Sequence, residues 1–171
     1  MSFVRRLLCL SVLALSVSSA LADFDEDYES SVWTEIEVQL PDSPKPENLL
    51  PFYVSAATEN KFFVDGSTLK VGSDGVVRYV LLVVSSQGVK NVTFEGMRCE
   101  TRERRIYASG RSSGKWSKAR NNEWVRIQEA SANRQHAVLF QDYFCPFGIM
   151  VRDAAEARNA LVLGGHPDIR H

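Results

Sequence analysis

The feature that most restricts the fold is an almost unbroken apolar run, VVRYVLLVVS, at residues 76–85. A strand can be apolar at successive positions only when both of its faces are covered, so this run predicts the central strand of a sheet. Turn signals stand on both sides of it, Ser73-Asp74-Gly75 before and Gln87-Gly88 after. With the β-rich runs around these turns they predict an antiparallel meander, with strands at 61–65, 68–71, 76–85, 90–99, 104–109 and 124–128.

Two segments upstream complete the predicted sheet side of the chain. Residues 34–40, TEIEVQL, alternate polar and apolar side chains with the two-residue period of a half-buried strand, so one more strand is expected there. Residues 41–51, PDSPKPENLLP, hold four of the six prolines. Because proline fixes φ and lacks a backbone donor, this piece is predicted to be an extended connector outside the sheet.

The C-terminal third changes its pattern. Residues 133–144 are predicted to be helical and to stop before Pro146, although HAVLFQDYF also fits a strand. Residues 153–163 begin with an N-capping Asp, continue with good helix formers and end at Gly164, which predicts a second helix followed by a tail over 164–171. The expected fold is a single α+β domain over residues 32–163, with five to seven antiparallel strands and one or two helices packed on one face.

The first 22 residues have the pattern of a secretory signal. Two arginines precede an apolar run, and Ala20-Leu21-Ala22 ends the segment as an A-x-A cleavage site, so we expect a mature chain from Asp23. Residues 23–31 are too acidic to pack and are predicted to form a flexible leader. No transmembrane segment is expected after cleavage, and the export signal predicts that the protein works outside the cytoplasm.

Export out of the cytoplasm bears on the oxidation state of the cysteines. Removal of the signal takes Cys9 and leaves Cys99 and Cys145, which are predicted to form a disulfide because such bonds persist outside the cytoplasm. The loop between them contributes on the order of 4 kcal/mol in the chain-entropy model. The alternative is one reactive thiol and one buried thiol.

The motifs of common enzymes are absent from the sequence. GRSSGKW at residues 110–116 has one residue too few between its glycines for a P-loop and places Trp116 where a magnesium-binding hydroxyl is needed. No pair of histidines has metal-ligand spacing, and no G-x-S-x-G or S-x-x-K motif occurs. We therefore expect no cofactor, no metal and no catalytic residue. The rival hypothesis is a hydrolase whose carboxylates meet only in the fold.

Charge is distributed unevenly along the chain. Residues 23–47 hold nine Asp or Glu against one Lys, whereas residues 98–120 hold eight Lys or Arg against two Glu. Such separation can steer a ligand or fold one region onto the other. For an exported protein an anionic envelope component or an acidic protein is a more probable partner than nucleic acid. The candidate ligand-binding residues are Arg104, Arg105, Arg111, Lys115, Trp116 and Lys118.

The run NLLPFYVSAATENKFFVDGSTLKVGSDGVVRYVLLVVSSQGVKNVTFEGMRCETRERRIYA, residues 48–108, resembles the CNP-one-like family of exported proteins from Gram-negative bacteria. The likeness extends from Trp33 to the last predicted helix. It implies a periplasmic single domain, and it supplies no activity, cofactor or site residue. The sequence therefore predicts an envelope-associated binding module in which residues 98–120 contact an anionic partner.

Overall fold

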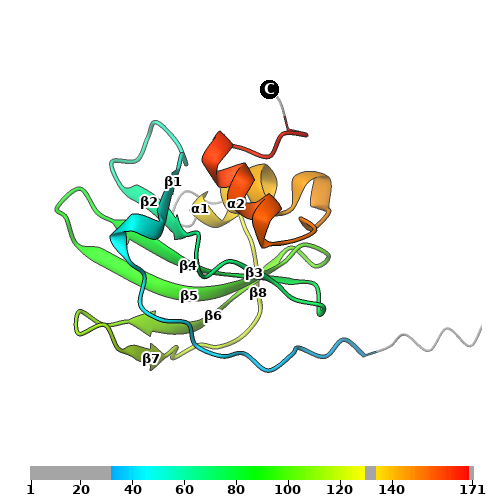
Figure 1. Cartoon of the computed structure of the whole chain (residues 1–171), viewed down its shortest axis with the longest axis horizontal. Coiled ribbons are helices and arrows are strands. Elements are labelled where there is room, and N and C mark those ends of the chain that lie inside the picture. The colour runs from blue at the N-terminus through cyan, green and yellow to red at the C-terminus, as the bar shows by residue number, and fades with distance from the viewer. Residues whose placement is uncertain (1–31, 130–133, 170–171) are drawn as a thin grey trace, which may run out of the picture. The chain divides into compact units, whose positions relative to one another are not determined.

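The computed structural model describes residues 32–129 and 134–169. The chain divides into two units, Met1–Val32 and Trp33–His171, and the second holds an antiparallel sheet of eight strands with a helical layer on one face (Figure 1). The strand order is β1-β2-β4-β5-β6-β7, with β3 paired to β4 and β8 paired to β6. The strands are β1 (Leu49–Phe52), β2 (Lys61–Asp65), β3 (Lys70–Val71), β4 (Val76–Val84), β5 (Lys90–Arg98), β6 (Glu103–Gly110), β7 (Trp116–Lys118) and β8 (Val125–Arg126).

Strand β4 is the central strand that the apolar run predicts. Its residues 76–82 are all buried, and it pairs with β2 and β3 on one side and β5 on the other. The expected strand at 68–71 is shorter, because the Thr68 hydroxyl donates to the Asp65 carbonyl and Thr68 stays in the turn after β2. The register shift between β5 and β6 lies at Phe94/Glu95, next to the Gly96 that interrupts the alternation of β5.

The helical layer confirms the predicted α+β class. The segment that fitted either a helix or a strand is helical over its described residues, 134–144. It comprises α1 (Arg134–Val138), the π-helical η3 (Leu139–Phe144), the 3-10 turn η4 (Pro146–Gly148) and α2 (Ala154–Leu163). Asp153 caps α2 by accepting from the backbone N–H groups of Ala155 and Glu156, and Gly164 ends it with φ 76°.

The main core lies between these helices and the sheet. Tyr79 of β4 packs on Phe144 of η3, with ring centroids 5.2 Å apart, and both side chains are fully buried. The predicted disulfide joins Cys99, just after β5, to Cys145, just after η3. It fixes the helical layer to the sheet at the end of β5.

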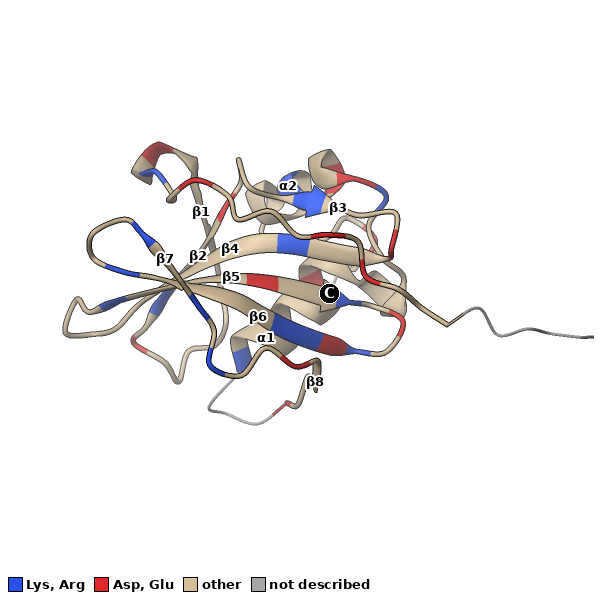
Figure 2. Ribbon diagram, turned by 90° about the horizontal axis from the view of Figure 1, so that it is seen from below, with Lys and Arg blue, Asp and Glu red and all other residues tan. Residues whose placement is uncertain are grey.

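The predicted strand at 34–40 is wrong. Residues 33–44, here called the strap, are extended but belong to no strand, and they cross the sheet face opposite the helices (Figure 2). The alternation fails because Glu35 faces the sheet, where it meets the buried Arg78 and the half-buried Arg105, while Ile36 and Leu40 are 45% and 53% exposed. An ionic contact therefore overrides the apolar period.

The Pro-rich connector is also corrected in its second half. Residues 46–48 form the 3-10 turn η1 (Pro46–Asn48), and Leu49–Phe52 is strand β1. Pro51, opposite Phe63, is tolerated in β1 because this strand is at the edge of the sheet. The backbone N–H that proline lacks would point away from the sheet, where there is no strand to accept it. Beyond α2, the backbone N–H of His166 donates to Asp142 at 2.7 Å, so the start of the predicted tail packs on the helical layer.

Candidate functional site

The predicted basic site is divided among three places in the fold. Arg104 lies on the helix side of β6, where its charge acts on the buried Glu95, and Arg105 lies on the strap side. Arg111, Lys115, Trp116 and Lys118 belong to the β6–β7 hairpin at one end of the sheet. The six residues therefore do not form one surface.

Arg105 is part of an ion cluster beneath the strap. Its Nη1 donates to Oε2 of Glu35 at 2.5 Å, and Arg78 donates to Oε1 of the same carboxylate at 3.3 Å. Arg78 also binds Asp74 at 2.6 Å, and the Tyr107 hydroxyl donates to Glu35. Burial, followed by the hydrogen bond to Glu35, raises the pKa of Tyr107 well above its usual value. In this cluster the acidic region folds onto the basic one, so these arginines are already neutralised.

Two further arginines of the basic region serve the fold as well. The Arg98 guanidinium lies 3.7 Å from the centre of the Trp33 ring and 5.8 Å from that of Trp124, and these cation–π contacts fix the start of the strap. Arg102 pairs with Glu129 at 2.7 Å. Neither arginine is available to a partner without breaking a contact within the domain.

Four other cations lie at the end of the sheet where β4 stops. Lys61 and Lys90 both lie opposite Val84 in the strand register, on either side of it. On the neighbouring hairpin, the backbone of Arg111 donates to the carbonyl of Lys115 at 2.9 Å. We call this group the basic end: Lys61, Lys90, Arg111 and Lys115, all exposed.

A hollow of about 510 Å³ adjoins the basic end. Trp116 forms part of its wall and is held in place, because its Nε1–H donates to the Pro41 carbonyl at 2.7 Å. The Ser43 hydroxyl of the strap donates to Gly114, so the strap also closes this side of the hairpin. The lining consists of Ser43, Pro44, Lys90, Val92, Gly110, Arg111, Ser112, Gly114 and Trp116.

The charge of the basic end is uncompensated within the described part of the chain. None of its four cations forms an ion pair with a described carboxylate. Lys118 extends the positive surface along β7, opposite Ala108. The arrangement suits a multivalent anion that contacts several cations and the edge of the Trp116 ring.

Lys61 and Lys90 lie outside the region that the charge count selected. Their relation to Arg111 depends on the register of β2, β4, β5 and β6, in which Val92 lies opposite Gly110. Hairpin counting from the Gly88 turn places Lys90 at the start of β5. The bulge beside Glu95 then shifts the register of β6 by one residue. The periodicity of the sequence does not predict this shift, so it does not predict which residues of β6 lie beside Lys90.

A buried acid–base pair lies on the helix side of the sheet. Glu95 accepts from Tyr79 at 3.1 Å and Thr93 at 2.7 Å, and its Oε2 lies 2.8 Å from Nε2 of His136. Burial acts to raise the pKa of Glu95, but the charge and hydrogen bond of His136 lower it below its usual value. Glu95 and His136 are 1% and 4% exposed, so they stabilise the core and are closed to a substrate.

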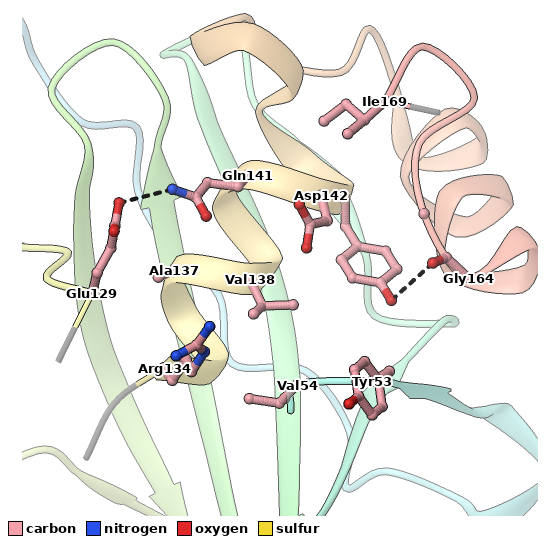
Figure 3. A pocket seen from close by; sticks show the side chains of 12 residues that line it. Tyr53, Val54, Glu129, Arg134, Ala137, Val138, Gln141, Asp142, Gly164 and Ile169 are labelled. Carbon is pink, nitrogen blue, oxygen red and sulfur yellow. Dashed lines mark hydrogen bonds between the residues drawn. The ribbon is translucent and has the colours of Figure 1, made fainter. Parts of the chain in front are cut away.

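A second hollow of about 390 Å³ lies beside α1 and η3 (Figure 3). Glu129 accepts from Gln141 at 2.9 Å, and the Tyr143 hydroxyl donates to the Gly164 carbonyl at 3.3 Å. Its charges are mixed, because Glu129 faces the same space as Arg134. It lacks the excess of one charge that marks the basic end.

Two carboxylates meet at one arginine: Glu35 and Asp74 both pair with Arg78, at 3.3 and 2.6 Å. No group of three or more His, Cys, Asp or Glu side chains in the described part is placed to hold a metal ion. No described helix is long and apolar enough to cross a membrane.

The fold and these features define a small α+β domain with one disulfide, a strapped sheet face and an exposed basic end. The chain belongs to the CNP1-like family, whose pattern matches residues 28–162. Searches of curated proteins and of solved structures found no match. The family is the one that residues 48–108 resemble.

Proposed function

We propose that this protein is a non-catalytic binding module of the bacterial envelope, and that its basic end holds an anionic glycolipid or polymer. One observation supports this proposal above the others. Lys61, Lys90, Arg111 and Lys115 have no acidic partner in the described ranges, whereas Arg78, Arg98, Arg102 and Arg105 are all engaged inside the domain.

The physical argument concerns desolvation and screening. Exposed cations retain their hydration, so each contributes little to affinity alone, but several acting on one polyanion add their attractions and speed encounter. Such binding weakens as salt rises, because the Debye length shrinks to about 10 Å at 0.1 M. Trp116 supplies an apolar wall at the same place, which suits a sugar or acyl part next to the anionic group.

The test measures how tightly the mature protein binds to vesicles that contain lipopolysaccharide. We expect Arg111→Glu/Lys115→Glu to weaken binding at low salt by about tenfold or more, because each reversal replaces attraction by repulsion. The matched control is Arg126→Glu/Arg134→Glu, which changes net charge equally at exposed positions away from the basic end. Equal losses in the two variants contradict the site, and binding that ignores salt contradicts the mechanism.

An acidic protein partner gives a different result. The wild-type protein captures such a partner and the Arg111→Glu/Lys115→Glu variant does not, while neither protein binds the vesicles. That outcome keeps the basic end as a site and rejects the glycolipid or polymer as its ligand.

A further inference from the structure

A separate hollow of about 430 Å³ lies between the strap and strands β6 and β7. It shares no residue with the basic end or with the hollow beside Trp116. Its lining is partly apolar and partly polar. The apolar residues are Ile36, Val38, Leu40, Tyr107 and Ala108, and the polar residues are Glu35, Arg105, Lys118 and Asn122.

The strap supplies the exposed apolar wall of this hollow. Ile36 and Leu40 are 45% and 53% exposed, and Val38 is half-buried because it packs against the small core on this face of the sheet. Tyr107 and Ala108, at 7% and 1% exposure, belong to that core and form the floor. The fold therefore leaves apolar surface of Ile36 and Leu40 in water, and a ligand that covers it is stabilised by its removal from water.

Two of the polar groups in the lining neutralise each other. The Glu35 carboxylate accepts from Arg105 at 2.5 Å, and it also accepts from Arg78 at 3.3 Å. Its charge is therefore opposed by two guanidinium groups. The positive charge in the lining that has no such partner is that of Lys118.

Lys118 and Asn122 are the donors that this hollow offers to a ligand. Lys118 is exposed and forms no ion pair with a described carboxylate. Oδ1 of Asn122 accepts from Nε of Arg105 at 2.8 Å, and because arginine can only donate, this contact fixes which side of the amide carries the NH₂ group. That NH₂ group has no acceptor among the described residues, so an anionic oxygen in the hollow can meet a cation and an amide donor.

We propose that this hollow, here called the strap groove, binds a small amphiphile with one anionic head and one apolar chain. The head lies at Lys118 and Asn122, and the chain lies along Val38 and Leu40. The volume falls within the range of about 300–1,000 Å³ that is typical of small-molecule sites. A cationic head is repelled by Lys118, and an uncharged head gains nothing from its charge.

Two kinds of compound share this chemistry, free fatty acids and single-chain anionic phospholipids. The experiment titrates the mature protein with octanoate and, separately, with octanol and octyltrimethylammonium, and follows backbone amide shifts by NMR. We expect saturable binding of octanoate, with shifts centred on Val38, Leu40, Ala108 and Lys118. Octanol should bind more weakly, and octyltrimethylammonium weaker by about tenfold or more, because like charges repel. Decanoate and an octanoyl lysophosphatidylglycerol, added as competitors, then separate the two sources.

Two matched pairs of variants test the location. Lys118→Glu should weaken octanoate binding by about tenfold or more, whereas Arg120→Glu, an equal change of charge two residues away and outside the lining, should leave it unchanged. Leu40→Ser should weaken it about fivefold or more by removing apolar wall. Val89→Ser is the control for Leu40→Ser, because Val89 is 67% exposed in the turn between β4 and β5. All four side chains are exposed, so these variants are expected to fold.

Several results overturn the proposal. They are the absence of saturable binding, equal effects within either pair of variants, and octanol or octyltrimethylammonium binding at least as tightly as octanoate. If octanoate binding is instead abolished by Arg111→Glu/Lys115→Glu and kept by Lys118→Glu, the anion belongs to the basic end. The strap groove then fails while the proposed function stands.

Discussion

Glu35 is the residue whose replacement most directly tests how the strap is held. Its carboxylate meets Arg105 at 2.5 Å and Arg78 at 3.3 Å, and it accepts from the Tyr107 hydroxyl, while its side chain is 14% exposed. Glu35→Gln keeps the size and removes the charge. Arg78 then keeps the carboxylate of Asp74, whereas Arg105 keeps only its hydrogen bond to the Asn122 side-chain oxygen at 2.8 Å.

The magnitude follows from burial. Loss of one partner costs about 3–5 kcal/mol in a fully buried pair, but only about 0.2–1 kcal/mol in an exposed one. Glu35 and Arg105, at 14% and 24% exposure, lie between these limits, and Arg78 retains Asp74. We therefore expect Glu35→Gln to lower the free energy of unfolding by about 2 kcal/mol.

The assay is urea denaturation of the mature protein, with Glu37→Gln as the control. Glu37 is the next glutamate along the strap and is exposed, so its replacement should stay within about 0.5 kcal/mol of the wild type. The melting temperature of Glu35→Gln should fall by roughly 4–8 °C for a domain of this size. If the two variants prove equally stable, the ion cluster does not hold the strap.

Two other substitutions probe the sheet faces. A Cβ on Gly96 would lie 2.9 Å from Cζ of Tyr107 and closer still to its hydroxyl, so Gly96→Ala should lower the free energy of unfolding by about 1–3 kcal/mol in urea denaturation. Adding Tyr107→Phe to the same chain should recover part of the lost stability. An unchanged denaturation midpoint in Gly96→Ala contradicts the contact. The pKa of Glu95 in the native protein lies below its ordinary 4.5, so the unfolded chain binds more protons at this residue and stability falls as the pH falls toward that pKa. Glu95→Gln should therefore flatten the dependence of unfolding free energy on pH between about pH 6 and pH 3. An equally steep dependence in the variant contradicts a stabilising role for the Glu95 carboxylate.

Features with strong local signals could be predicted from the sequence. The unbroken apolar run fixed β4 as the central strand, and Asp153 and Gly164 marked the ends of α2 within a residue. The disulfide was predicted from the compartment and the cysteine count, and the structure joins the same pair, Cys99 and Cys145. Each of these depends on neighbouring residues or on a short list of alternatives.

Features set by contacts distant in sequence could not be predicted. Glu35 faces inward because Arg78 and Arg105, 43 and 70 residues away, meet it there, and no periodicity within the strap encodes that. The basic end has the same origin, because Lys61 and Lys90 reach Val84 only through the strand register. A count of charge along the chain therefore selected Arg105, which is engaged, and missed two lysines that are exposed.

The basic end itself is tested most directly by mapping where a polyanion binds. Backbone amide shifts of the mature protein would be recorded during titration with a short polyphosphate at low salt, and again at high salt. The account predicts shifts concentrated at Lys61, Lys90, Arg111 and Lys115, which disappear as salt rises. Shifts centred elsewhere, or none at low salt, would contradict the claim that this end of the sheet is a binding surface.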